Sequence, residues 1–414
     1  MRLLQLALVF TFVPALASAQ DWPQWRGPER DGVAHGVAAP AAWPDELRQI
    51  WRIEVGLGYS SPVVAGNRVF LHTRVGDEEV VTALDLATGA VVWQQRYSAP
   101  YRVNPAARSH GPGPKSTPVV AGGRLHTLGI SGVLSSFDAA SGRVIWRKSF
   151  DGVYPGAAPT YGTAMSPVVD RGLLIAHVGT DRAGALTAFD AATGEVRWQW
   201  DGDGPGYASP IVVEIAGTRQ VITQSRRAVV GVAAASGALL WRIPLATAYD
   251  QNIVTPIVRG DVLIYSGLGN PTIAVRLVRS GETWRPEPVW KNPDVSFYMS
   301  TPVVAGGRIY GLRDRNKGQF VGLDAATGRL LWETRGREGD NAAIVDLGSA
   351  LLWLTSGAEL VVSEKAADAF SELRRYTVAD SPTWAHPVPT AAGILIKDER
   401  SLALWRAQPG GPGL

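Results

Sequence analysis

The segment ALDLATGAVVW at residues 83–93 decides the fold. In its Asp-x-x-Thr-Gly core, the Asp85 side chain can accept backbone N–H groups just downstream, while Gly89 adopts a positive φ. Together they close a tight hairpin between two short strands rich in β-branched residues. Trp93 follows four residues after Gly89 and ends the second strand. The segment therefore predicts a hairpin that carries one large aromatic ring near its end.

The same unit recurs along the chain. Further copies run from Asp138 to Gly142 with Trp146, from Asp190 to Gly194 with Trp198, and from Asp324 to Gly328 with Trp332. A degenerate copy without the aspartate runs from Ala233 to Gly237 with Trp241. The leading tryptophans, at positions 51, 93, 146, 198, 241, 290 and 332, are spaced by 42 to 53 residues. Four-stranded propeller blades repeat at about 40–50 residues, so the spacing indicates one blade per unit.

A second motif, Ser/Thr-Pro-Val/Ile-Val, precedes most of these hairpins. It begins at Ser61, Thr117, Ser166, Ser209, Thr255 and Thr301. Because proline cannot donate a hydrogen bond to a sheet, it places this strand at an edge, as expected for the innermost strand of a blade. The sequence therefore predicts an all-β, eight-bladed β-propeller of four-stranded antiparallel blades over residues 50–407.

The end of the repeat array suggests how the ring closes. Residues 333–380 form a degenerate seventh unit, and the eighth, which begins at Ala385, has only three strands. We expect the N-terminal segment Ile50–Val55 to supply the missing strand, since a shared last blade removes exposed sheet edges. One stretch, 364–375, has helix-like apolar spacing, and we expect it to cover the seventh blade.

This pattern resembles the pyrroloquinoline-quinone-type (PQQ-like) β-propeller repeat, whose consensus is close to Ala-x-Asp-x-x-Thr-Gly-x-x-x-Trp. The resemblance covers nearly all of the chain after residue 20. The opening Asp21–Pro28, DWPQWRGP, is similar to the start of secreted bacterial members of this group. The architecture also resembles the propeller component of the outer-membrane protein assembly machinery. Such a resemblance implies a fold more firmly than an activity.

Both chain ends carry signals outside the repeats. Arg2, the apolar run Leu3–Ala17 and the Ala-Ser-Ala at 17–19 predict a signal peptide over 1–19, followed by an N-terminal extension over 20–49. The Pro/Gly-rich residues 408–414 predict a disordered tail. We therefore expect a periplasmic or secreted protein. We expect a monomer without a lipid anchor, because the chain has no cysteine to carry one.

Composition and motifs bear on the chemistry. A net charge of +3 over 414 residues gives no field that would attract nucleic acid. Zero cysteines exclude thiolate zinc sites, c-type haem and the vicinal cysteine pair that the resemblance implies for large quinoprotein dehydrogenases. The loop 201–206, DGDGPG, predicts a turn rather than a calcium site. We predict no catalytic residue, metal ligand or cofactor; PQQ with Ca²⁺ is the alternative.

Topology predicts where recognition takes place. In an up-and-down blade the two tight turns share one face, so the longer links between blades gather on the opposite face, where we expect a partner to bind. An aromatic collar precedes the inner strands there; its alternative role is to plug the channel. The candidate ligand-face residues are Tyr59, Arg108, His110, Lys115, Tyr161, Tyr207, Gln251, Asn252, Tyr298 and Trp384.

Three functions are compatible with these features. The first is a non-catalytic binding or scaffolding module that holds a protein or an extracellular polymer at the long-loop face. The second, implied by the resemblance, is a PQQ-dependent dehydrogenase of sugars or alcohols. The third is a polysaccharide-binding propeller whose aromatic collar stacks on sugars.

Overall fold

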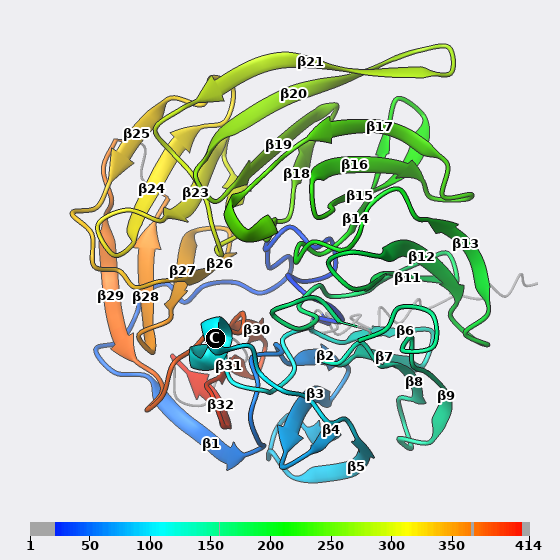
Figure 1. Cartoon of the computed structure of the whole chain (residues 1–414). Coiled ribbons are helices and arrows are strands. Elements are labelled where there is room, and N and C mark those ends of the chain that lie inside the picture. Colours follow the sequence, from blue (N-terminus) through cyan, green and yellow to red (C-terminus); the bar gives the residue numbers. More distant parts are fainter. Residues whose placement is uncertain (1–20, 157, 366–367, 408–414) are drawn as a thin grey trace, which may run out of the picture.

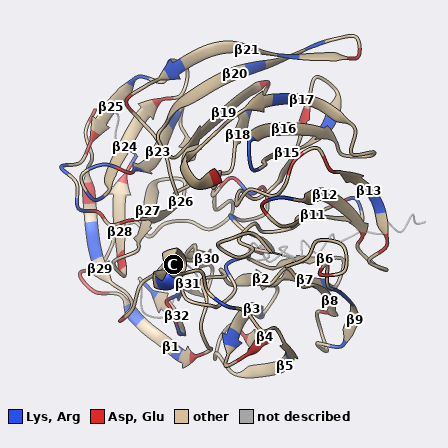
Figure 2. Cartoon of the chain, in the orientation of Figure 1, with Lys and Arg blue, Asp and Glu red and all other residues tan. Residues whose placement is uncertain are grey.

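Eight four-stranded antiparallel sheets surround a central axis in a computed structural model that describes residues 21–156, 158–365 and 368–407 (Figure 1). The predicted eight-bladed propeller is confirmed. The predicted signal peptide and disordered tail, residues 1–19 and 408–414, lie outside the described residues. Figure 2 shows Lys and Arg interspersed with Asp and Glu around the ring. Within the described chain, no helix has the length and apolar character to cross a membrane.

The first four blades follow one another in chain order, each running outward from the central channel. Their strands are β2 (Val63–Ala65), β3 (Arg68–Val75), β4 (Glu78–Asp85) and β5 (Val91–Ser98); β6 (Val119–Ala121), β7 (Arg124–Leu128), β8 (Leu134–Asp138) and β9 (Val144–Lys148); β10 (Val168–Asp170), β11 (Leu173–Gly179), β12 (Gly184–Asp190) and β13 (Val196–Trp200); β14 (Ile211–Ile215), β15 (Thr218–Gln224), β16 (Ala228–Ala233) and β17 (Leu239–Pro244). In each sheet the strand that follows the proline is an edge strand, as predicted.

The remaining blades complete the ring. Their strands are β18 (Ile257–Arg259), β19 (Val262–Gly267), β20 (Asn270–Ser280) and β21 (Thr283–Asn292); β22 (Val303–Ala305), β23 (Arg308–Arg313), β24 (Gln319–Asp324) and β25 (Leu330–Glu333); β26 (Ala342–Asp346), β27 (Ala350–Thr355), β28 (Glu359–Glu364) and β29 (Glu372–Thr377); and β30 (Val388–Thr390), β31 (Gly393–Lys397) and β32 (Ser401–Arg406) with β1 (Arg48–Glu54). Two short 3₁₀ helices, η1 (Pro105–His110) and η2 (Ala248–Asp250), lie in links between blades.

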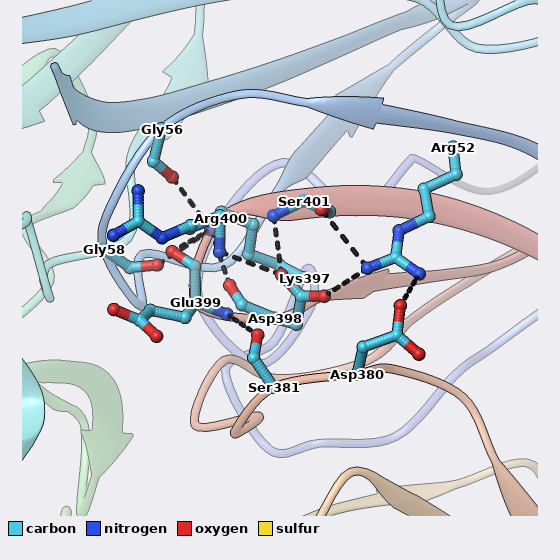
Figure 3. Close-up of polar contacts among 10 residues, drawn as sticks. All are labelled: Arg52, Gly56, Gly58, Asp380, Ser381, Lys397, Asp398, Glu399, Arg400 and Ser401. Carbon is cyan, nitrogen blue, oxygen red and sulfur yellow. Dashed lines mark hydrogen bonds and ion pairs between the residues drawn. The ribbon is translucent and has the colours of Figure 1, made fainter.

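The N-terminal strand closes the eighth blade, as predicted. β1 pairs antiparallel with β32, and Trp51 lies opposite Leu404. Lys397, at the end of β31, secures the closure (Figure 3): its Nζ donates to the carbonyl oxygens of Gly56 and Gly58 at 3.3 and 3.0 Å, and to those of the two residues that follow it. All three ammonium hydrogens can therefore be used inside a buried joint.

The repeated turn performs the roles that its residues predict. Asp85 Oδ1 accepts the backbone N–H groups of Ala87 and Thr88, both at 3.1 Å. The glycine has a positive φ and lies against the tryptophan of the preceding blade: a Cβ on Gly142 would lie 2.6 Å from Trp93 Cδ2. Trp93 Nε1 also donates to Ala139 O of that turn, at 3.0 Å. The turn and the ring therefore dock neighbouring blades together.

The same docking hydrogen bond forms at five of the interfaces between blades. The donors and accepting carbonyl groups are Trp51 and Leu86, Trp93 and Ala139, Trp146 and Ala191, Trp198 and Ala234, and Trp290 and Ala325. On the neighbouring strand, the residue opposite the indole is small: Ala83 faces Trp93 and Gly322 faces Trp332. A Cβ on Gly322 would lie 2.4 Å from Trp332 Cε2, so the ring needs that space.

The blades without the motif dock differently. The fifth blade has a long hairpin, β20–β21, which reaches the fourth blade: Arg279 Nη1 donates to Thr218 Oγ1 at 2.8 Å, and Trp284 packs into the same apolar cluster as Trp241. Trp241 Nε1 then donates to Gln220 Oε1 within its own blade. In the seventh blade, the helix predicted over 364–375 is wrong: its described part contains the outer strand β29.

Phe370 explains the helix-like pattern in that stretch. Its ring packs against Phe320, Trp332 and Trp353, with centroids 5.4 to 6.1 Å apart, and so fills the interface between the sixth and seventh blades. Phe370 and Leu373 are therefore apolar because they pack against blades. Their spacing matched a helical stripe by coincidence, which is common for short segments.

The serine or threonine before each inner-strand proline has a role that the sequence analysis did not assign. Its hydroxyl accepts the backbone N–H of the corresponding residue in the preceding blade. The bonds run from His386 N to Ser61 and on through Thr117, Ser166, Ser209 and Thr255 to Thr301, at 2.8 to 3.2 Å. This ring of hydrogen bonds links all blades except the seventh, whose inner strand begins at Ala342. It satisfies buried N–H groups where adjacent sheets diverge.

Candidate functional site: a blind pocket at the loop face

A pocket of about 510 Å³ opens on the axis of the ring. Its walls come from the links between blades, which lie on the face opposite the tight turns; we call these the loop face and the turn face. Each link contributes to the lining: Tyr59, Lys115, Tyr161, Tyr207, Tyr249, Tyr298, Asn341 and Trp384 come from eight successive links. The volume lies within the range of small-molecule and peptide sites.

Most of the predicted ligand-face residues meet in this pocket. Those that line it are Tyr59, His110, Lys115, Tyr161, Tyr207, Gln251, Tyr298 and Trp384. Arg108 is exposed on η1 and does not line the pocket. Asn252 is fully buried, and its amide donates to the carbonyl oxygens of Ser225 and Leu245 at 2.8 and 3.1 Å. Asn252 therefore serves a link between blades and is not available to a ligand.

The aromatic collar packs ring against ring around the cavity. Trp384 contacts Tyr59 and His110, with centroids 6.4 and 4.5 Å away. On the other side, the rings of Tyr161 and Tyr207 are 5.9 Å apart. These contacts fix the rings as walls, and the space between them stays open. The contact between His110 and Trp384 also brings η1, from the link after the first blade, against the link that enters the eighth (Figure 1).

The channel beneath the collar is filled by residues 22–34, which we call the channel plug. Trp22 pairs with Val64 of the first blade, and Ala34 N donates to Asp346 O of the seventh at 2.8 Å. Between them, the buried Arg26 guanidinium donates to Thr301 O and Pro302 O at 2.8 Å. Arg30 does the same for Ser166 O and Pro167 O on the third blade, at 2.8 and 3.0 Å. The plug therefore crosses the whole channel.

The sequence predicts this segment only as part of an N-terminal extension, and its place in the channel is seen only in the structure. Its signal was the opening DWPQWRGP, whose two tryptophans and arginine had no role in the repeats. Burial lowers the pKa of Arg26 to about 10 and that of Arg30 to about 9. Both guanidinium groups remain charged at neutral pH, and the inner-strand carbonyl groups accept their hydrogen bonds in place of water.

The floor of the pocket carries no net charge. It is formed by Trp25 of the plug and by His386, whose rings meet edge to face at 5.5 Å. Burial, reinforced by Arg26, lowers the pKa of His386 to about 3. The imidazole is therefore neutral at physiological pH. Because the plug lies directly below, the pocket is blind: a chain can enter it only by an end or by a side chain.

Lys115 is the single charged side chain that the described part of the chain places in the walls. Burial lowers the pKa of His110 to about 4, with Lys115 adding to the effect, and raises the pKa of Tyr59 to about 12. Burial also raises the pKa of Tyr207. These groups are neutral at pH 7, whereas Lys115, with its pKa lowered to about 8 by burial, is mostly protonated. Among the residues that the structure describes, no carboxylate lines the pocket.

The lining does not suit a PQQ cofactor. That quinone carries three carboxylates and works with Ca²⁺ held by oxygen ligands, but these walls offer one cation and no acidic side chain. No group of three or more His, Asp or Glu in the described chain is placed to hold a metal ion. Asp203 of the acidic loop accepts instead from Ser225 Oγ and Arg227 N, at 2.7 and 2.8 Å.

Comparisons with known proteins point to two groups. The chain is 26% identical over 304 residues to outer membrane protein assembly factor BamB of Yersinia pestis, which covers 69% of this chain and 70% of that one. It is 25% identical over 254 residues to methanol dehydrogenase subunit 1 of Methylorubrum extorquens, 57% of this chain but only 38% of the dehydrogenase. The crystal structure of BamB from Moraxella catarrhalis superposes with a TM-score of 0.63 at 14% identity, covering 88% of this chain and 99% of that one.

The family model agrees with the repeat assignment. The model described as outer membrane protein assembly factor BamB matches residues 41–107, 77–334 and 286–391, overlapping segments that together span nearly the whole propeller. It takes in the strand that closes the ring and all eight inner strands in full. Taken with the blades, their docking turns and the closed ring, this match shows that the chain belongs to the PQQ-repeat propeller family of outer membrane protein assembly factor BamB.

Proposed function

We propose that this protein is a non-catalytic binding module of the cell envelope, which holds a protein partner at its loop face during outer-membrane protein assembly. The observation that carries this proposal is the wall of the central pocket. It combines seven aromatic residues and one lysine, but it has no carboxylate and no histidine that is protonated at neutral pH. Such a wall offers contact area and one charge, and no described carboxylate lies in it to act as a general base or to bind a metal ion.

The family and the predicted signal peptide support the same choice. The match to BamB of Yersinia pestis covers 69% of this chain and 70% of that one, while the dehydrogenase is matched over only 38% of its length. The signal peptide predicted over 1–19 would deliver the chain across the inner membrane. A rigid ring with long links on one face is the usual way in which repeat scaffolds present a binding surface.

The test compares the two faces directly. A photo-crosslinking residue replaces Tyr249, which is 78% exposed at the pocket rim, or Leu239, which is 47% exposed beside a tight turn. After irradiation of living cells, we expect Tyr249 variants to crosslink to an envelope protein and Leu239 variants to give no discrete product. Equal crosslinking from both positions, or none from Tyr249 and its neighbours at the rim, would contradict a loop-face function.

A cofactor-binding measurement tests the alternative that the protein is a PQQ-dependent dehydrogenase. The purified protein is titrated with PQQ and Ca²⁺ while cofactor absorbance and dye reduction with alcohols and sugars are followed. We expect no saturable, calcium-dependent binding and no dye reduction, because a single lysine cannot balance three carboxylates. Saturable binding together with dye reduction would overturn the non-catalytic proposal.

A further inference from the structure

Two lysines of this protein, the buried Lys397 and the partly buried Lys115, differ in how their ammonium groups are satisfied. Lys397 donates to four carbonyl oxygens and is closed off from solvent. Lys115 donates to one, Tyr161 O at 2.8 Å, and lines the central pocket. An ammonium group has three hydrogens, so up to two of those on Lys115 remain for the pocket. No carboxylate of the described residues lies within 4.0 Å of its Nζ.

An ammonium group in such surroundings favours an anion. Burial of a charge without a partner is costly, and most buried charges are paired. Elsewhere in this chain Lys365 shows the usual solution, with Nζ 2.9 Å from Asp346 Oδ1. At Lys115 the neighbouring wall groups are neutral phenols and the neutral His110, so nothing in the wall compensates its charge. A ligand carboxylate would complete this arrangement with a charge-assisted hydrogen bond.

The shape of the pocket restricts what carries that carboxylate. The channel plug closes the floor, so a polymer cannot thread through the ring and must insert an end or a side chain. The rest of the lining is largely aromatic and aliphatic, with Trp25, Ile253 and Met299 among its residues. A polypeptide C-terminus meets both requirements, because its last residue places one carboxylate beside one side chain.

We propose that the blind pocket captures the C-terminus of a partner polypeptide that ends in an aromatic or large aliphatic residue, with Lys115 holding the terminal carboxylate. This inference rests on the protein-binding function proposed above and names the part of the partner that enters the pocket. Lys115 acts as the carboxylate-binding group, and the aromatic collar packs around the terminal side chain.

The experiment uses a short, N-terminally labelled Gly/Ser peptide ending in Phe, with either a free C-terminal carboxylate or a C-terminal amide, and follows fluorescence anisotropy with the full mature chain. We expect the free acid to bind at least about tenfold more tightly than the amide. The K115Q variant removes the charge but keeps a donor for Tyr161 O, and it should reduce the affinity for the acid by about tenfold while leaving the amide unchanged.

Two variants control for charge and folding. R108Q removes a positive charge from the same link but outside the pocket lining, and it should bind the acid as the unmodified protein does. K115R keeps the charge and should retain most of the affinity. Because burial lowers the pKa of Lys115 to about 8, raising the pH from about 7 to about 9 should weaken binding of the acid alone.

Three results would overturn the proposal. The first is equal affinity for the acid and the amide, and the second is no saturable binding of the acid up to about 1 mM. The third is displacement of the peptide by N-acetylphenylalanine at the same concentration as by the unlabelled peptide, which would indicate a site for free small acids. A neutral glycan that binds independently of Lys115 would also count against it. If these assays fail but Tyr249 still crosslinks to an envelope protein, the proposed function stands and only the terminal-carboxylate assignment falls.

Discussion

The turn face and the loop face of the propeller differ in how far they repeat. On the turn face, a glycine turn and a tryptophan dock five of the blade interfaces with the same hydrogen bond, and four of these turns also carry the aspartate. On the loop face, the links differ in length and composition, although five of the eight contribute a tyrosine to one pocket. The repeated face supplies stability because each copy packs its turn against the tryptophan of the preceding blade. The variable face is free to specialise, since its links do not carry the repeated docking turn.

The largest effect should come from filling the space behind a docking tryptophan. In G142A the new Cβ would lie 2.6 Å from Trp93 Cδ2 at a φ of +74°, and we expect the free energy of unfolding to fall by about 2–4 kcal/mol. G122A is the matched control: its φ is +55°, and no atom lies within 4 Å of the new Cβ. It should cost only about 1 kcal/mol in chemical denaturation. Equal losses would mean that backbone strain, and not docking, sets the need for glycine.

Acid should act on the two faces at different pH. Burial lowers the pKa of His177 to about 4 and that of His386 to about 3, and both lie toward the loop face. As the pH falls below about 6.5, the unfolded chain takes up these protons first, so stability falls between about pH 6.5 and 4. On the turn face, hydrogen bonds from Thr88 lower the pKa of Asp85, so its contribution is lost only below about pH 3.8.

Thermal unfolding followed by circular dichroism checks this order. The melting temperature should drop between about pH 6.5 and 4, and the variants H177Q and H386Q should each reduce the size of that drop. Gln at 177 can still donate to Asp203 O, the partner of the imidazole Nε2 at 3.1 Å. A stability that stays level down to pH 4 would show that these histidines are protonated in the folded protein.

A smaller effect should separate regular from irregular interfaces. Trp93 Nε1 donates to Ala139 O, whereas the buried Trp332 Nε1 has no partner among the described residues. Both W93F and W332F remove part of a ring, but only W93F also breaks a hydrogen bond. We expect W93F to lose about 1 kcal/mol more than W332F in urea denaturation. A larger loss for W332F would mean that packing alone determines the docking energy.

The smallest change in stability should come from the pocket rim. Tyr249 is 78% exposed and holds a positive φ of 60° in η2. We expect Y249A to shift the free energy of unfolding by no more than about 0.5 kcal/mol, since exposed side chains away from packing contribute little. A loss comparable to that of G142A would show that the links of the loop face hold the ring together after all.

Much of this architecture could be predicted because its causes are local. The hydrogen bonds of Asp85, the positive φ of Gly89 and the edge position of the proline strands all arise within a few residues. The closure by β1 also followed from counting strands. By contrast, the helix predicted over 364–375 was wrong. Phe370 is apolar there because its ring contacts strands that lie far away in sequence.

The residues of the pocket also fall into those that the sequence could predict and those that it could not. The aromatic collar was predictable, because each ring precedes an inner strand and topology brings those positions to one mouth. Asn252 was indistinguishable in sequence from its neighbour Gln251, yet only Gln251 lines the pocket. Nothing local marked which of two adjacent amides would face the axis, since that depends on how the link packs between the fourth and fifth blades.

The sequence by itself determined the number of blades, the docking turns and the closure of the ring, because these rest on short-range turn chemistry repeated at a fixed spacing. Only the tertiary structure decided that the channel is blind and that Lys115 is left with free donors inside it. Both depend on residues far apart in the chain: Arg26 reaches Thr301, and Lys115 reaches the backbone of Tyr161. Such contacts form only once the ring has brought those segments together, so no local pattern records them.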